Sequence, residues 1–185
     1  MLFDIKQLKY IGKNVTIGEM VKIVNPDKVE IDDYSRIDDF TIIVGGKGIK
    51  IGKFVHIASY TSVIGGGELI MEDFSGTAAG VRLITGSDEY TGKCLTNPTT
   101  PIKYRPYAIT GKIHVQKHVI LATNSIVYPN VTIGEGTIVG AASVVNLSLD
   151  PWGIYMGYPA RKIKIRESET IHRMEKELLA EIYGG

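Results

Sequence analysis

Residues 31–68 read IDDYSR (31–36), IDDFTI (37–42), IVGGKG (43–48), IK (49–50), IGKFVH (51–56), IASYTS (57–62) and VIGGGE (63–68). Each block of six opens with an aliphatic residue, its second position is often Gly, Ala or Asp, and its fifth is mostly small or β-branched. The same pattern begins at residue 11 and, after a break, continues over residues 115–150. Self-similarity of this kind is the signature of a repeat protein.

A second spacing of 20 residues joins Ile11, Ile31, Ile51 and Met71, which is three blocks of six plus two residues. An α-helix does not explain a period of six, whereas a triangular solenoid with three short strands per turn does. We expect the opening aliphatic residue to point inward, the small fifth residue to fit a tight corner, and Gly, Asn and Asp to supply unusual φ angles. The alternative, a sandwich of short alternating strands, gives no reason to keep this phase for so long.

Two segments leave the pattern. Residues 89–114 lose the six-residue spacing and hold three of the seven prolines, which predicts a functional excursion loop. Residues 168–183 have the spacing of a helix that Ser168 or Thr170 can cap, with Gly184 after its end. Its expected docking stripe consists of Ile171, Met174, Leu178, Leu179 and Ile182. The chain therefore divides into an N-terminal segment (1–10), a solenoid (11–166) and a C-terminal helix (167–185).

Composition narrows the functional classes. The 185 residues carry 21 Lys and Arg against 20 Asp and Glu, and without a basic block there is little reason to expect a nucleic-acid partner. A single cysteine, Cys94, cannot form an internal disulfide, which favours a reducing, cytoplasmic compartment. No apolar run reaches the length of a membrane span, and the first residues lack a signal peptide's apolar block.

The hexads, the loop and the ending VYPNVTIGEGTIVGAASVV (127–145) and WGIYMGYPARKIKI (152–165) closely resemble the hexapeptide-repeat acyltransferases. The segment Gly157–Arg161 resembles the ending of the galactoside and maltose acetyltransferase group and its sugar-modifying relatives. The resemblance implies an all-β solenoid, a left-handed parallel β-helix that forms homotrimers and transfers an acetyl group from acetyl-CoA. The expected acceptor is a hydroxyl or amine of a sugar or nucleotide-sugar, in surface polysaccharide biosynthesis.

Acetyl transfer from a thioester needs a base, and His is the natural choice near neutral pH. In the galactoside branch that base is a His directly after Thr-Gly, whereas this chain has Ser87 there. His56 is the expected replacement as a corner residue near the excursion loop, with Asp88 as the carboxylate that could orient it. The alternatives without a catalytic role are that His56 is a polar corner residue and that Asp88 is an ordinary acidic residue of the loop. Tyr60 and His114 are candidate substrate-binding residues, and no metal is expected.

The resemblance assigns Thr123, Ala141 and Asn146 to the pantetheine arm of CoA and the basic residues after Gly157 to its phosphates. An anion would suit the cluster of Arg161, Lys162 and Lys164, with Arg166 nearby. The alternative is that these are the charged residues of an ordinary strand edge. Coil two carries the four acids Asp32, Asp33, Asp38 and Asp39, for which we favour a role as corner residues over contacts with sugar hydroxyls.

Two rival functions stay open at this point. A γ-type carbonic anhydrase shares the β-helix and binds zinc through three His, and His56, His114 and His118 give that count. However, the close pair is four residues apart here, against five in that family. A catalytically inactive β-helix that serves as an assembly partner is the second rival, and Ser87 in place of the usual His motivates it.

Overall fold

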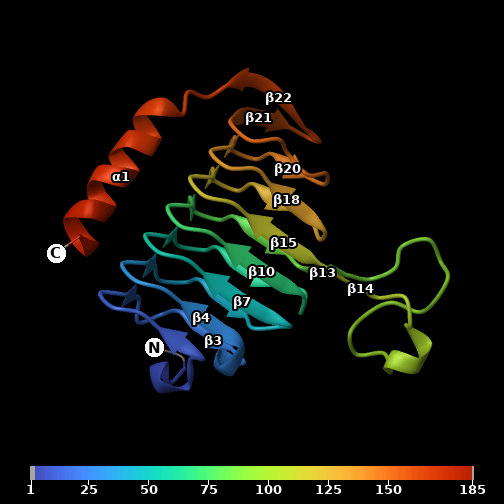
Figure 1. The fold of residues 1–185 in the computed structure, drawn as a ribbon. Helices are drawn as coiled ribbons and strands as arrows, with labels where there is room; N and C mark the ends of the chain where they lie inside the picture. Colours follow the sequence, from blue (N-terminus) through green and yellow to red (C-terminus); the bar gives the residue numbers. More distant parts are fainter. Residues whose placement is uncertain (1–2, 185) are drawn as a thin grey trace.

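The computed structural model describes residues 3–184, which wind into a triangular solenoid with one helix along a corner and one loop projecting from another (Figure 1). Three parallel sheets form its sides. The predicted fold class, a left-handed parallel β-helix with an excursion loop and a C-terminal helix, is confirmed. No helix in the described part of the chain is long and apolar enough to cross a bilayer.

The strands of each sheet follow one another along the solenoid axis. Sheet A contains β1 (Tyr10–Ile11), β4 (Val29–Ile31), β7 (Gly48–Ile51), β10 (Glu68–Met71), β15 (Lys112–Val115) and β18 (Val131–Ile133). Sheet B contains β2 (Thr16–Ile17), β5 (Arg36–Ile37), β8 (His56–Ile57), β11 (Gly76–Thr77), β16 (Ile120–Leu121), β19 (Ile138–Val139), β21 (Gly153–Gly157) and β22 (Ala160–Ile165). Sheet C contains β3 (Lys22–Val24), β6 (Ile42–Val44), β9 (Ser62–Ile64), β12 (Arg82–Ile84), β17 (Ile126–Val127) and β20 (Val144–Val145).

The sheets meet at three corners, which we call A–B, B–C and C–A in the order in which the chain turns them. Each coil places residues of equal hexad position in register, so that Ile37 pairs with Ile57, and Ile57 with Thr77. The inner stack holds the opening aliphatic residues together with buried fifth residues such as Ser35 and Thr61. Thr77, the single polar opening residue, lies 3.0 Å from Thr61 between their hydroxyl oxygens, and this hydrogen bond satisfies it inside the core.

All variation in coil length enters at the C–A corner. The inward residues on its two sides are Ile23 and Val29 in an early coil and Val127 and Val131 in a late one, so the late corner is shorter. The excursion loop leaves from the same corner. Because the other two corners keep one length throughout, their residues stay in register from coil to coil.

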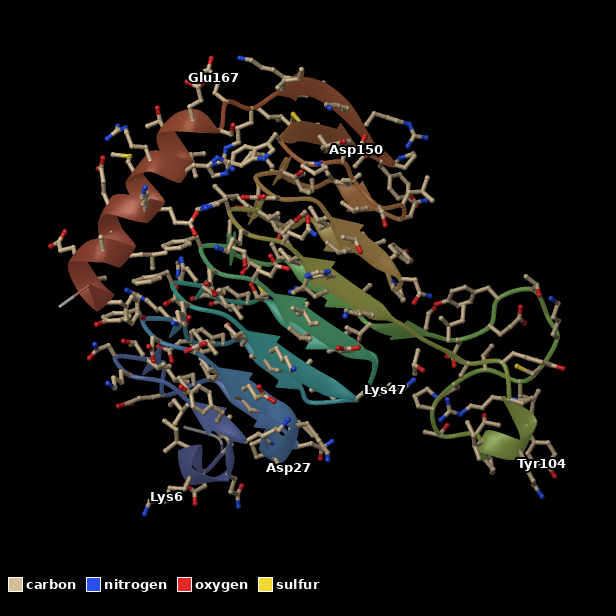
Figure 2. All side chains as sticks on the ribbon, viewed as in Figure 1. Lys6, Asp27, Lys47, Tyr104, Asp150 and Glu167 are labelled. Atoms are coloured by element: carbon tan, nitrogen blue, oxygen red, sulfur yellow. The ribbon has the colours of Figure 1, made fainter. Side chains whose placement is uncertain are left out.

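The excursion loop differs from the predicted 89–114. It leaves the solenoid at β13 (Gly86–Ser87), which pairs antiparallel with β14 (Ile109–Thr110), and it contains one short 3₁₀ helix at Ile102–Tyr104. Residues 112–115 already belong to β15. His114, the last residue of the predicted excursion loop, therefore sits within sheet A, between Ile70 and Thr132. Tyr104 lies far out on the loop (Figure 2).

The C-terminal helix α1 (Glu169–Tyr183) begins after Ser168 and ends at Gly184, close to the prediction. It runs back along the A–B corner, as Figure 1 shows. Ile171, Leu179 and Ile182 are half-buried, but Met174 is 58% exposed and does not belong to the docking face. Glu175 takes part in that face in its place, because polar partners on the corner face this side of the helix.

A column of rings along the A–B corner receives α1. Tyr34, Phe54, Phe74 and His118 occupy the same place in successive coils with positive φ, and neighbouring rings stack at 5.0, 4.8 and 5.2 Å between centroids. The next coil has Gly136, and a Cβ there would lie 2.3 Å from the ring of Trp152, which covers this place instead. The ring of Trp152 thus lies over Gly136 and occupies the place in the column that this glycine leaves without a side chain.

Polar contacts fix the helix to this column. Glu175 accepts hydrogen bonds from Lys117 Nζ and pairs with His118 Nε2, both at 2.8 Å. Burial alone raises the pKa of Glu175, but the hydrogen bonds from Lys117 and His118 outweigh it and lower that pKa below its ordinary value. At the other end of the helix, the Tyr183 hydroxyl donates to Asp33 at 3.1 Å.

We predict that Glu175→Gln loosens α1 at neutral pH and removes part of the acid sensitivity of its docking. The folded pKa of Glu175 is lowered, so its contribution is present above the unfolded value near 4.5 and is lost as pH falls below it. The expected loss at pH 7 is about 1–3 kcal/mol in the free energy of unfolding. Urea unfolding and fluorescence of Trp152, which lies beside His172 of the helix, measure the effect.

Glu177→Gln is the matched control, because Glu177 pairs only with Arg173 on the exposed side of the same helix. Equal loss in both variants, or an unchanged pH dependence in Glu175→Gln, would contradict the assignment of Glu175 as the anchor.

Candidate functional site

The B–C corner carries most of the residues that the sequence associates with chemistry. From the second coil on, its successive turns are Asp38–Phe40, Ala58–Tyr60, Ala78–Gly80, Ala122–Asn124 and Gly140–Ala142. The last residue of each turn has positive φ, which brings the middle residue and the ring or amide at the third place to the surface. No helix covers this corner in the described part of the chain, in contrast to the A–B corner (Figure 1).

His56 opens β8 on the outer face of sheet B and reaches the acid that begins the neighbouring B–C turn. Its Nε2 lies 2.8 Å from Asp38 Oδ2, and Asp38 Oδ1 accepts from Arg36 Nε at 2.6 Å. Burial by itself raises the pKa of Asp38, but the hydrogen bonds from His56 and Arg36 bring that pKa below its ordinary value. A charged Asp38 holds the proton of the imidazole on Nε2, which leaves Nδ1 as the nitrogen able to accept one.

A hollow of about 530 Å³ lies beside His56 on sheet B. The residue in register above His56 is Gly76, so no side chain fills the space over the imidazole. The hollow extends to the B–C corner and is lined there by the small side chains of Ala58, Ala78 and Ala79. A thin, mainly apolar ligand group can therefore approach the imidazole along this face.

Two aromatic rings follow at the same corner. Phe40 and Tyr60 stack with centroids 5.2 Å apart and planes within 7° of parallel, and they are 48% and 57% exposed. The Arg82 guanidinium donates to the Tyr60 carbonyl oxygen from the sheet C side. Tyr60, predicted as a substrate-binding residue, thus lies at the same corner as Asp38.

Several predicted donor residues lie higher on the same corner. Ala141 follows Thr123 one coil on, and the Ala142 amide donates to the Thr123 carbonyl at 2.9 Å. Both side chains are exposed. Above them, β22 pairs antiparallel with β21 and places Arg161 opposite Met156, whose side chain lies against Gly140. Thr123, Ala141 and Arg161 are therefore aligned along one corner.

The other predicted donor residues are less closely grouped. Lys162 and Lys164 lie further along β22, opposite Tyr155 and Ile154, and both are exposed. Asn146 follows β20 at the far end of sheet C, away from the B–C corner. Arg166 is not a free cation for an anion: its guanidinium donates to the carbonyl oxygens of His118 and Gly136 at 2.8 and 2.9 Å. This corrects its grouping with the phosphate-binding residues.

Asp88 lies apart from His56 within the chain. It belongs to a separate hollow of about 210 Å³ at the C–A corner, together with Ser87, Arg105 and Ile109. Its Oδ2 accepts from the Asn97 amide at 3.1 Å. The carboxylate that orients His56 in this chain is therefore Asp38, which the sequence analysis treated as a corner residue.

His114 and His118 each lie beside a different carboxylate. His114 Nε2 lies 2.6 Å from Glu72 Oε1 on sheet A, and His118 packs in the A–B column with Glu175. Among residues 3–184 no group of three or more His, Cys, Asp or Glu side chains is arranged to hold a metal ion. The three His counted for a zinc site thus lie on sheet B, on sheet A and at the A–B corner, each beside its own carboxylate.

Known proteins with similar sequences and structures identify the family of this chain. No protein-family model matches the chain. A dTDP-4-amino-4,6-dideoxy-D-glucose acyltransferase from Escherichia coli is 33% identical over 164 residues, which are 88% of this chain and 85% of that protein. The chain belongs to the hexapeptide-repeat acyltransferases. A variant of AntD, an N-acyltransferase from Bacillus cereus solved with dTDP-4-amino-4,6-dideoxyglucose and CoA, is 42% identical with a TM-score of 0.90, over 96% of this chain and 94% of that chain.

The maltose acetyltransferase branch is less similar to this chain than AntD is. A maltose O-acetyltransferase from Clostridium difficile 630 is only 17% identical, with a TM-score of 0.61 over 88% of this chain and 72% of that chain, so it shows the fold alone. The prediction of an acyltransferase is confirmed by family membership. The expectation of a His after Thr-Gly came from the galactoside and maltose branch, to which the similarity is the weaker one.

The pairing of His56 with Asp38 was not predicted from the sequence, which suggested Asp88 as the partner. A signal for it was present, because a 20-residue coil puts residue 36 directly beside residue 56 and residue 38 diagonally across from it. Nothing in the hexad pattern, however, gives the direction in which an exposed imidazole turns at a strand end.

Proposed function

We propose that this protein transfers an acyl group from acyl-CoA, in the simplest case acetyl-CoA, to the amine of a dTDP-linked 4-amino-4,6-dideoxyhexose. The observation that carries the proposal is its likeness to AntD over nearly the whole of both chains, since that enzyme is solved with CoA and with this sugar nucleotide. The Escherichia coli relative, named for the same acceptor, supports it independently.

The B–C corner suits the donor. Thr123 and Ala141 are small enough for a pantetheine arm to lie against the backbone of successive coils, which rise by about 4.8 Å each. Arg161, with Lys162 and Lys164 on the same strand, offers cations for the phosphates at the upper end of that line. In this arrangement the thioester points down the corner, toward Ala78, Ala79 and the hollow beside His56. Asn146 would contact the donor from the sheet C side.

The proposed chemistry is direct attack of the amine on the thioester carbonyl. A bond forms between the sugar nitrogen and the carbonyl carbon, the carbon–sulfur bond breaks, and the nitrogen loses a proton. His56 accepts that proton on Nδ1 while Asp38 stabilises the imidazolium through Nε2, and the proton passes to the departing CoA thiolate. Direct transfer needs no covalent enzyme intermediate.

We further propose that the protein acts as a homotrimer. Within one chain Asp88 lies at the C–A corner and His56 on sheet B, and the excursion loop projects away from its own coils (Figure 2). A neighbouring subunit packed against the B–C corner could bring its Asp88, and with it a second carboxylate for the acceptor amine, to the hollow beside His56. His114, which faces sheet A beside Glu72, would contact the acceptor only through such a neighbour.

In the cell, the proposed reaction belongs in the cytoplasm, where acyl-CoA and sugar nucleotides are made, and its product would feed a surface polysaccharide. A putative colanic acid biosynthesis acetyltransferase, WcaF of Escherichia coli K12, is 32% identical over 84% of this chain and 69% of that protein, and it supports this role.

Acyl transfer to a matched pair of acceptors tests the function. With acetyl-CoA, we expect thiol release and formation of the N-acetyl product from dTDP-4-amino-4,6-dideoxyglucose, and no product from the analogue with a 4-hydroxyl group. Thiol titration and mass spectrometry of the nucleotide product measure both. Faster acylation of the hydroxyl analogue, or thiol release without an acylated nucleotide, would overturn the proposal.

His56→Ala tests the general base. We expect kcat/KM to fall about 10²- to 10⁴-fold, while the Kd for CoA stays unchanged. For Asp38→Asn we expect kcat/KM to fall by a smaller factor, because this change removes the orienting charge but keeps the imidazole. His172→Ala is the control, as that His lies on α1 at the A–B corner. Wild-type kcat/KM in His56→Ala would remove His56 from the mechanism, and Asp88→Asn is then the variant to measure.

A further inference from the structure

The two columns of aromatic rings in this solenoid differ in one respect. At the A–B corner the rings are covered by α1, and a glycine in the column is covered by the ring of Trp152. At the B–C corner, Phe40 and Tyr60 stack in the same geometry, yet about half of each ring is exposed. An exposed, preformed aromatic stack at a solenoid corner is a surface that a further planar group can join.

The place above Tyr60 lacks a ring. The corresponding residue of the next coil is Gly80, with φ +76°, and the coil after it has Asn124. A Cβ at Gly80 would lie 2.1 Å from Asn124 Oδ1, so the Asn124 amide hangs over the place that a side chain would take. An amide offers one donor group and one acceptor, the complement of the imide edge of a thymine or uracil base.

Charge at the two sides of Tyr60 suits a nucleotide. Arg82 donates one N–H to the Tyr60 carbonyl, and its guanidinium has further donors for phosphate oxygens. On the sheet B side of this corner, Asp38 begins the neighbouring turn and His56 lies in β8, just before the turn that contains Tyr60. A base stacked on Tyr60 therefore has its diphosphate beside Arg82.

We propose that Tyr60, supported by Phe40, is the stacking platform for the pyrimidine base of the nucleotide-linked acceptor, with Arg82 beside it for the phosphates. The inference rests on the proposed function for the identity of the acceptor. It places the base at the lower part of the B–C corner, below the donor line of Thr123 and Ala141, so that donor and acceptor share one corner from opposite ends.

Equilibrium binding of dTDP, with no acyl transfer involved, tests the platform. Tyr60→Asn removes the ring but keeps a residue that this fold places at positive φ elsewhere, as at Asn124. Base stacking on an aromatic side chain predicts a Kd for dTDP roughly 5- to 150-fold higher in this variant. Tyr60→Phe keeps the ring and is expected to bind dTDP like the wild type. CoA is expected to bind all of these proteins equally.

Tyr10→Ala is the matched control, since Tyr10 is 49% exposed on sheet A and far along the coil from the B–C corner. Equal dTDP affinity of Tyr60→Asn and wild type would overturn the platform and leave the proposed function standing if the amino sugar is still acylated. Equal weakening in Tyr60→Phe and Tyr60→Asn would also overturn it, because the hydroxyl rather than the ring would then bind. Wild type that acylates an amino sugar but fails to bind dTDP would overturn both this inference and the dTDP-linked acceptor.

Discussion

Register is the constraint on which this structure depends. The parallel ladders hold each inward residue directly over its counterpart in the next coil, as Ile37, Ile57 and Thr77 show. Burial of the inward side chains, most of them aliphatic, fixes that register, because a shift by one residue would turn the buried set outward. Outward and corner residues are then stacked as a consequence, at the rise of about 4.8 Å per coil.

Stacked corners become columns with different uses. The A–B column lies along α1, most of its rings are half-buried, and its contacts with the helix run through Glu175, His118 and Trp152. The B–C column has the same backbone conformation but small residues and uncovered rings, so that its surface stays open to a ligand. Insertions enter only at the C–A corner, where the loop can grow without shifting either column.

The fold could be predicted because a period of six expresses the geometry of one strand and one corner. Even Thr77, a polar residue at an opening position, points inward, since Thr61 satisfies its hydroxyl. The site was harder for the opposite reason. The roles of Asp38 and Arg166 follow from the directions of long exposed side chains, and the hexad pattern does not specify those directions. Handedness likewise came from resemblance, because right-handed crossovers are the general rule.

We infer that the B–C corner holds donor and acceptor in one line, and a crystal structure with CoA and dTDP bound would test this. We expect the pantetheine arm against Thr123 and Ala141, the thiol toward the hollow beside His56, and the thymine ring on Tyr60. A pantetheine arm along the A–B or C–A corner, or a thymine ring away from Tyr60, would contradict it.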